Sequence, residues 1–313
     1  MPKKKFLIIV ESPSKCTKIE KYLNESFKEY IFKCVASVGH IKNLPYKKLS
    51  VDVKNNYEAD FQIIDDENNL KTVNNIKSLA RKYKNVILAT DQDREGERIA
   101  YDLAILLKLD LSKNNRMVFN EITKPAIKNA FNNLQKVNKK YVESQTARRV
   151  IDRLIGYKVS PLTMRKIQKK ASAGRVLSAT TGIIYDRKQE IDKHETESEF
   201  VTNGNFKPKS KYILENCDLN IKFKDQKKTL AFLKKIQKKE FYIGSITSKE
   251  KKTNPPSPFI TSTINQASPY TVRKTTGVLQ KLYQAGFITY IRTDSTAISK
   301  DFQKNILEFI DKV

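Results

Sequence analysis

Three carboxylates crowd into one short segment of the chain. Asp91, Asp93 and Glu95 lie within five residues of one another, directly after the apolar run 86–89. An apolar run that ends in polar residues is typical of a buried strand that meets a loop, and open α/β sheets bind ligands at that end of their strands. Neighbouring carboxylates repel one another, and a hard divalent cation with oxygen ligands relieves the repulsion. The segment therefore predicts a Mg²⁺ site, with a solvated acidic loop as the alternative.

A tyrosine near the other end of the chain is the second candidate for chemistry. Tyr290 lies in segment 289–295 (TYIRTDS), two residues before Arg292. A phenol with an ordinary pKa near 10 is a poor nucleophile unless a cation stabilises its anion. Arg292 could stabilise that anion or hold a phosphate. Most tyrosines do neither, so a core or surface role for this one of 14 is the alternative.

The charge of the chain indicates its class of partner. Its 313 residues include 60 Lys and Arg against 34 Asp and Glu, a net charge of +26. Such an excess favours a polyanion, with nucleic acid first and an anionic membrane surface second. No apolar run reaches the roughly 20 residues that span a bilayer, and no secretion signal is visible. Cys16, Cys34 and Cys217 are far apart in sequence and form no zinc pair or obvious disulfide framework, which suits a reducing, cytoplasmic compartment.

Strand and helix signals alternate over the first third of the chain, where the acidic segment lies. Apolar runs predict strands, and stripes of apolar residues at helical spacing predict helices. The predicted strands are 6–10, 86–89 and 117–119, and the predicted helices are 14–23, 70–83, 96–107 and 124–134. This alternation predicts a parallel α/β sheet flanked by helices.

The rest of the chain divides by its local signals. Residues 141–193 are basic and helical in pattern, and residues 249–258 form a charged, proline-rich linker. A helix is expected at 271–285 and another at 301–313, whose apolar residues have little sequence left to pack against. We therefore expect a continuation beyond Val313. Short β-like runs fall between the basic segment and the linker, at 200–201, 212–214, 219–223 and 241–247.

Three segments together match a known family. They are 11–15 (ESPSK) after the first strand, the acidic segment, and 289–295, in that order. Each is weak alone, but their order and spacing are specific. The chain resembles a type IA DNA topoisomerase of the bacterial topoisomerase I kind over nearly its whole length. Further matching segments are 36–41 (ASVGHI), 119–123 (FNEIT), 147–153 (ARRVIDR), 172–176 (SAGRV) and 258–263 (PFITST).

The resemblance implies a multidomain fold. It places an α/β toprim domain at 1–137, a helical DNA-groove domain at 138–198, a partial β-rich arch at 199–254 and the start of a helical tyrosine-bearing domain at 255–313. We expect a truncated form of the family's fold, which would be an incomplete toroid. A second chain would be one way to complete that toroid. A chain of this length is then expected to relax supercoiled DNA poorly even if it cleaves DNA.

The resemblance also implies a reaction. Tyr290 would attack a phosphodiester of single-stranded or negatively supercoiled DNA in the genome and become joined to the 5′ phosphate. Glu11 would donate a proton to the leaving 3′ oxygen, while Lys15 and Arg292 stabilise the phosphate. Asp91, Asp93 and Glu95, with Glu11, would hold Mg²⁺. No nucleotide cofactor is expected, because the chain lacks a G-x-x-x-x-G-K-[ST] phosphate loop.

The family's DNA contacts map mainly onto the basic helical segment, where an arginine row suits contacts to the DNA backbone. A solvated helix face is the alternative. The residues implied are His40, Arg148, Arg149, Val150, Asp152, Arg153, Lys158, Arg165, Ser172, Ala173, Gly174, Arg175, Val176, Leu177, Gln280 and Thr289.

Some positions depart from the family pattern. Leu177 stands where glutamine is usual, Gln284 where glutamate is common, and Met164 where tryptophan is frequent. Two other classes stay open. A different toprim enzyme, such as a primase or nuclease, would not need segment 289–295. A truncated DNA-binding remnant would keep the motifs but would cleave DNA poorly or not at all and could not pass strands.

Overall fold

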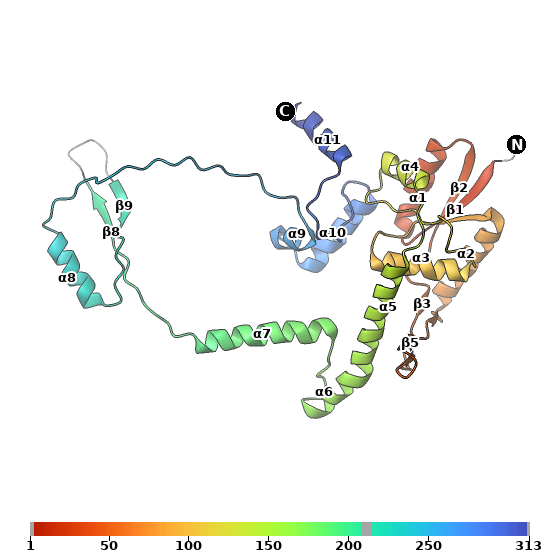
Figure 1. Cartoon of the computed structure of the whole chain (residues 1–313), viewed down its shortest axis with the longest axis horizontal. Helices are drawn as coiled ribbons and strands as arrows, with labels where there is room; N and C mark the ends of the chain where they lie inside the picture. The colour runs from red at the N-terminus through yellow and green to blue at the C-terminus, as the bar shows by residue number, and fades with distance from the viewer. Residues whose placement is uncertain (1–2, 208–213, 312–313) are drawn as a thin grey trace. The chain divides into compact units, whose positions relative to one another are not determined.

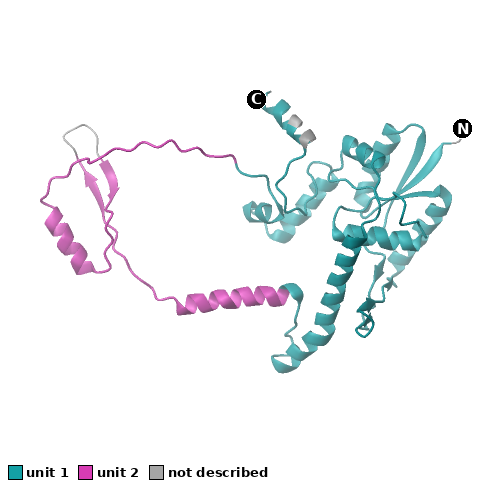
Figure 2. Cartoon of the chain, in the orientation of Figure 1, with its two compact units in different colours: residues 1–176, 256–313 teal, residues 177–255 magenta. Residues whose placement is uncertain are grey.

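The computed structural model describes residues 3–207 and 214–311, except the side chains of residues 300, 301, 304 and 305. The chain divides into two compact units, one made of residues 1–176 and 256–313 and the other of residues 177–255 (Figure 2). Unit 1 therefore joins the first half of the chain to its last 58 residues. No helix in the described ranges is both long and apolar enough to cross a membrane.

A three-stranded parallel sheet forms the centre of unit 1 (Figure 1). Its strands are β1 (Lys4–Val10), β2 (Tyr30–Ala36) and β7 (Asn85–Leu88), in the order β2-β1-β7. The central strand pairs in parallel with both neighbours, so Ile8 lies beside Cys34 on one side and Ile87 on the other. The predicted parallel α/β sheet is thus confirmed.

Successive residues of β1 point to opposite faces of the sheet, and both faces are covered by helices. Ile8 and Val10 pack with residues of α1 (Pro13–Ser26) and α4 (Lys124–Asn132). Leu7 and Ile9 pack with residues of α2 (Glu67–Tyr83) and α3 (Arg94–Leu106). All four of these β1 side chains are fully buried, which is why the strand reads as a continuous apolar run.

A long helix leads away from the sheet. The helix α5 (Lys139–Leu154) packs against α3 and continues through a π-helical turn, η1 (Ile155–Val159), into α6 (Ser160–Lys166) (Figure 1). Beneath α5 lies a small core that includes Leu44 and Val51. It is built on two short antiparallel pairs, β3 (Lys42–Asn43) with β6 (Gln62–Ile63) and β4 (Val51–Asp52) with β5 (Glu58–Ala59).

The last part of unit 1 carries the candidate tyrosine. Its helices are α9 (Thr261–Ala267), α10 (Val272–Gln284) and α11 (Lys300–Ile310). The loop after α10 rejoins the sheet domain, because Tyr283, Ile288, Tyr290 and Ile291 all pack against the core cluster of Ile8 and Val10. This contact brings together residues that are nearly 300 positions apart in sequence.

The described part of unit 2 contains few elements. They are α7 (Arg175–Lys193), which begins in the last two residues of unit 1, the antiparallel hairpin β8 (Asn203–Phe206) with β9 (Leu214–Asp218), and α8 (Gln226–Ile236). Aromatic rings hold the unit locally, with centroids 5.2 Å apart for Phe223 and Phe232.

Several element predictions need correction. Residues 117–119 form no strand; only Arg116 bridges, to Leu88 and to Gln135. In unit 2, residues 219–223 and 241–247 are not strands, apart from a single bridge between Phe200 and Phe223, and α8 was not predicted. Of the predicted run 212–214, only Leu214 lies within the described residues. The strand β2 was also missed, and the four-domain division stays a prediction.

Candidate active site

The site begins where two neighbouring parallel strands end. Glu11 directly follows β1, and Asp91 lies three residues after β7. Lys15, in the first turn of α1, reaches across and forms an ion pair with Asp91. Both side chains are buried, with 1% and 7% of their surface exposed. The ends of two strands thus place two carboxylates and an ammonium group together.

A buried arginine braces the acidic loop. Arg116 is fully buried, and its guanidinium donates to the backbone oxygens of Thr90 (2.7 Å) and Asp91 (2.8 Å) and to Glu97 Oε2 (3.0 Å). The loop backbone beneath Asp91 is therefore held on a charged, hydrogen-bonded support. Sequence reasoning missed Arg116, because it lies in none of the motifs.

Asp93 joins the acidic loop to the tyrosine. Its Oδ1 accepts the backbone N–H of Gly96 (2.8 Å) and so caps the N-terminus of α3. Its Oδ2 accepts the hydroxyl of Tyr290 (2.6 Å) and Nη1 of Arg292 (2.9 Å). Asp93 thus contacts both the phenol of Tyr290 and the guanidinium of Arg292, which lie 197 and 199 residues later in the sequence.

The loop that carries Tyr290 is docked by its backbone. The N–H of Tyr290 donates to the carbonyl of Asn120 (2.7 Å), and Lys18 donates to the carbonyl of Ala285. Gly286 has φ +73°, and a Cβ there would lie 2.5 Å from the carbonyl oxygen of Ile122. Only glycine allows both this backbone conformation and this close approach.

The surroundings shift the protonation of the central groups. Burial, followed by the charge of Asp91, raises the pKa of Glu11 from 4.5 to about 7. Burial and the hydrogen bond to Asp93 raise the pKa of Tyr290 above that of a free phenol. Burial acts to raise the pKa of Asp93 too, but hydrogen bonds from Tyr290 and Gly96 outweigh it and keep that pKa below its usual range. Glu11 and Tyr290 can therefore carry protons at pH 7, while Asp93 is ionised.

A second tyrosine lies beneath the first. Tyr283 is fully buried, its ring meets that of Tyr290 edge to face at 5.2 Å, and Lys15 Nζ lies 5.1 Å from its centroid. Its hydroxyl has no hydrogen-bond partner in the part of the chain that the structure describes. Sequence reasoning did not single it out, because nothing local distinguishes it from the other tyrosines.

Glu95, the third predicted carboxylate, turns toward α5. Its Oε2 lies 2.9 Å from His40 Nε2 and accepts from Gln145 Nε2 (3.0 Å), while Oε1 lies 3.8 Å from Arg148. Within residues 3–207 and 214–311, no group of three or more His, Cys, Asp or Glu side chains is arranged to hold a metal ion. The oxygen donors Glu11, Asp91 and Asp93 suit Mg²⁺ chemically, but Glu95 is engaged elsewhere.

The predicted DNA-binding residues of α5 serve different purposes. Val150 is buried in the core with Leu44 and Val51, so it does not join the basic face. Arg153 donates to the carbonyls of Leu44 (2.9 Å) and Pro45 (2.9 Å), and its guanidinium lies 4.8 Å from the Tyr157 ring. These contacts tie α5 to the loop that follows β3.

The other predicted contacts fall mostly on exposed surface. Arg148 is half exposed, Lys158 and Arg165 are exposed, and Arg149 donates to Asn43. Asp152 pairs with Arg175 Nε at 3.1 Å. The segment 172–176 is held by Ser160, whose hydroxyl contacts both the N–H and the carbonyl of Ala173 at 3.0 Å. Gln280 is half buried, Thr289 and Val176 are exposed, and Leu177 is exposed in unit 2.

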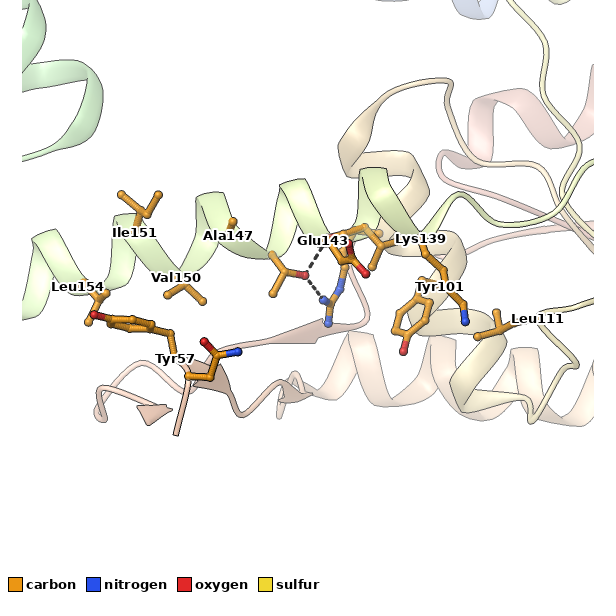
Figure 3. A pocket seen from close by; sticks show the side chains of 13 residues that line it. Tyr57, Tyr101, Leu111, Lys139, Glu143, Ala147, Val150, Ile151 and Leu154 are labelled. Carbon is orange, nitrogen blue, oxygen red and sulfur yellow. Dashed lines mark hydrogen bonds between the residues drawn. The ribbon is translucent and has the colours of Figure 1, made fainter. Parts of the chain in front are cut away.

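An apolar hollow lies apart from the candidate active site. It lies along α5 and is lined by Tyr57, Tyr101, Leu111 and Ile151 among others, with a volume of about 930 Å³ (Figure 3). Arg98 crosses it to donate to Thr146 Oγ1 (2.7 Å). None of the groups around Asp93 and Tyr290 lines this hollow.

Comparison with known proteins identifies the family of the chain. The family profile for DNA topoisomerase matches residues 136–313, and that for the Toprim domain matches residues 6–122. The solved structure of full-length topoisomerase I from Thermotoga maritima is 34% identical in sequence and superimposes with a TM-score of 0.79. The match covers 98% of this chain and 52% of that one, so the chain spans about half the length of this relative. With a Toprim domain followed by the DNA topoisomerase region, the chain belongs to the type IA DNA topoisomerase family.

Proposed function

We propose that this chain cleaves one strand of DNA by forming a phosphodiester bond between Tyr290 and a 5′ phosphate. The observation that carries the proposal is the contact of Asp93 Oδ2 with both the Tyr290 hydroxyl (2.6 Å) and Arg292 (2.9 Å). The nucleophile and the cation thus meet on one carboxylate, beside Glu11 and Lys15. That carboxylate is also the proton acceptor. This is the reaction that the family resemblance implies.

Tyr290 must lose its proton as it attacks. Its raised pKa keeps the phenol neutral at pH 7, so the proton has to move during bond formation. Asp93 is ionised and already accepts the hydroxyl hydrogen bond, which makes it the acceptor for that proton. The Arg292 side chain is 64% exposed, so it is free to turn from Asp93 to the phosphate oxygens. There its positive charge offsets the negative charge that develops on the phosphate.

Glu11 supplies the proton for the leaving group. A pKa of about 7 leaves a large fraction of its carboxyl groups protonated at neutral pH, as a general acid requires. Glu11 directly follows β1, and the charges of Asp91, Asp93 and Arg292 all act on its carboxyl group. Proton transfer from Glu11 to the 3′ oxygen completes a balanced exchange: the O–P bond to the 3′ oxygen breaks as the O–P bond to Tyr290 forms. The bond energy is conserved, so resealing needs no nucleotide.

Mg²⁺ is proposed as the cofactor, held by Asp91 and Asp93 with Glu11. The mutual repulsion of these carboxylates supports the assignment, since Asp91 and Asp93 both raise the pKa of Glu11. A bound Mg²⁺ would supply positive charge for the phosphate and the cut ends. Glu95 would join only by leaving His40 and Gln145. Arg116 keeps the loop of Asp91 in place, while Lys15 pairs with Asp91 and remains the predicted stabiliser of the phosphate together with Arg292.

DNA is proposed as the partner, with single-stranded DNA as the bound form. The net charge of +26 and the exposed cations Arg148, Lys158 and Arg165 support this. Arg148 lies within 3.8 Å of Glu95, so these cations begin next to the acidic loop. Relaxation of supercoiled DNA, an activity of whole topoisomerases, is a separate proposal for a chain that spans 52% of the Thermotoga protein.

The direct test is trapping of the adduct on oligonucleotides labelled at one end. After denaturation, the 3′-labelled strand should stay with the protein, while the 5′-labelled strand should be released as a shorter fragment. Tyr290→Phe should abolish the shifted band, whereas Tyr270→Phe, a change at an exposed tyrosine of the same unit, should leave it unchanged. Equal adduct from Tyr290→Phe would refute the proposal, and label retained from the 5′ end would reverse its polarity.

A further inference from the structure

Tyr283 lies where the tyrosine-bearing loop meets the sheet domain. It belongs to the last turn of α10, and its side chain is fully buried in the core of unit 1. The two residues that follow it are tied to α1. Gln284 donates to Ser12 Oγ (3.4 Å), and the carbonyl of Ala285 accepts from Lys18. The backbone that carries the Tyr283 ring is therefore held against the start of α1.

The ring of Tyr283 contacts two groups of the candidate active site. Its centroid lies 5.2 Å from that of Tyr290, with 65° between the ring planes, which is the edge-to-face geometry that aromatic pairs prefer. The Nζ atom of Lys15 lies 5.1 Å from the same centroid, within the range of a cation–π contact. One buried ring thus lies against both the proposed nucleophile and the cation that pairs with Asp91.

The ring of Tyr283, and not its hydroxyl, makes these contacts. The hydroxyl is buried and has no hydrogen-bond partner among the residues that the structure describes. A buried polar group without a partner lowers the free energy of unfolding, so the hydroxyl does not explain the placement of this side chain. What Tyr283 provides in this structure is a fixed aromatic surface.

Tyr290 depends on more than one contact for its orientation. Its backbone N–H donates to the carbonyl of Asn120, and its hydroxyl donates to Asp93 Oδ2. The hydroxyl hydrogen bond must change when the oxygen attacks a phosphate, because the proton then moves to Asp93. The contact with the Tyr283 ring does not involve that proton, so it can hold the Tyr290 ring throughout the reaction.

We propose that Tyr283 is a positioning residue for DNA cleavage, whose ring keeps Tyr290 and Lys15 in the orientation that the reaction needs. Without the ring, both side chains would stay on a fixed backbone but would have more rotamers open to them. The chemical step should then slow, while DNA binding by the exposed cations should not change. The inference rests on the proposed function of Tyr290, but one of its two measurements needs no cleavage.

The first measurement is the rate of adduct formation by the full 313-residue chain in a single turnover at saturating single-stranded DNA. Tyr283→Leu removes the ring and should lower the rate constant by about 10- to 100-fold, as expected for a misplaced nucleophile. The dissociation constant for DNA should stay at the parent value. Tyr283→Phe keeps the ring and should restore the parent rate. Its urea midpoint should be no lower than that of the parent, because no hydrogen bond is lost.

Phe131→Leu is the matched control for lost packing. Phe131 is an aromatic residue that packs against the same core cluster as Tyr283, and its ring centroid lies 4.8 to 5.4 Å from those of Phe6, Phe27 and Phe32. Phe131→Leu should lower the urea midpoint, as Tyr283→Leu does. It should leave the rate constant of adduct formation at the parent value, because the contacts of Tyr283 with the site remain.

The second measurement reports the orientation of Tyr290 in the absence of DNA. N-acetylimidazole acetylates accessible phenols, and peptide mass spectrometry gives the rate at Tyr290. In Tyr283→Leu, this rate should rise about threefold or more, because the aromatic contact that restrains the ring is lost. Tyr283→Phe should match the parent. A parent chain that forms no adduct would refute the proposed function, and the acetylation rates alone would then decide the inference about Tyr283.

Three results would each overturn the inference. The first is adduct formation by Tyr283→Leu at the parent rate. The second is a Tyr283→Phe protein as slow as Tyr283→Leu, which would assign the effect to the hydroxyl. The third is acetylation of Tyr290 at one rate in all three proteins. Equal slowing by Phe131→Leu would assign the effect to packing alone and would overturn it as well.

Discussion

The two units of the molecule differ in how firmly they hold their side chains. In unit 1, a sheet packed on both faces leads directly into the acidic loop, and even charged groups such as Arg116 and Lys15 are fully buried. In the described part of unit 2, Thr229 is the only buried residue. The proposed chemistry depends on contacts of 2.6 and 2.9 Å and therefore lies where the packing is dense. The comparison predicts that single substitutions matter far more in unit 1.

The largest effect is expected at Arg116. Arg116→Ala leaves Glu97 buried without its cation and the carbonyls of Thr90 and Asp91 without a donor, which should cost about 3–5 kcal/mol of unfolding free energy. The matched change in unit 2 is Arg187→Ala, which breaks an exposed pair with Glu190 and should stay within about 0.5 kcal/mol. Urea denaturation compares the two, and similar losses would contradict the contrast between the units.

The next effect concerns the docking of the tyrosine loop. Gly286→Ala forces a Cβ within 2.5 Å of the Ile122 carbonyl at φ +73°, so the loop must shift and Tyr290 must leave Asp93. Misplacement of this kind should lower the rate of adduct formation about 100-fold. Gly277→Ala is the control, since a Cβ there meets nothing within 4 Å and alanine favours the helix. Adduct formed at the same rate by both variants would show that the observed docking is not needed.

A smaller, pH-dependent effect is expected from Glu11. In EDTA, where no Mg²⁺ is bound, cleavage should fall about tenfold per pH unit above pH 7 as the acid loses its proton, and Glu11→Gln should be slow and insensitive to pH over this range. The free energy of unfolding should also depend on the protonation of Glu11. The folded-state pKa is raised, so its contribution is complete below pH 4.5 and is lost as pH rises through about 7. Parallel pH profiles for parent and Glu11→Gln protein would remove Glu11 from the role of acid.

The smallest effect concerns DNA binding by exposed cations. Each phosphate contact on single-stranded DNA contributes about −0.7 to the slope of log K against log salt. Arg148→Ala and Lys158→Ala should each make that slope shallower by about 0.7. Lys71→Ala, at an exposed lysine of α2 that pairs with Glu67, should leave it unchanged. An unaltered slope in the first two variants would place the DNA on another face.

The two units also differ in how well the sequence predicted their strands. Strands 6–10 and 86–89 were predictable because burial on both faces makes them continuous apolar runs, and Glu11 and Asp91 were found because they follow those strands. Strand β2 was missed because Lys33 interrupts its apolar pattern. The predicted strands at 219–223 and 241–247 of unit 2 failed because almost no core exists there to select strand over loop. Local patterns also contain nothing about contacts such as Tyr283 with Lys15, which arise only on folding.

The central proposal is that the hydroxyl oxygen of Tyr290 forms the O–P bond of a 5′-phosphotyrosyl adduct. One measurement tests it most directly. The denatured adduct is digested with nuclease and trypsin, and the modified peptide is sequenced by tandem mass spectrometry. We predict a nucleotide joined through its 5′ phosphate to the hydroxyl of Tyr290, ten or more times more abundant than on any other residue. A nucleotide found instead on Tyr283 or another side chain, or joined through a 3′ phosphate, would contradict the account.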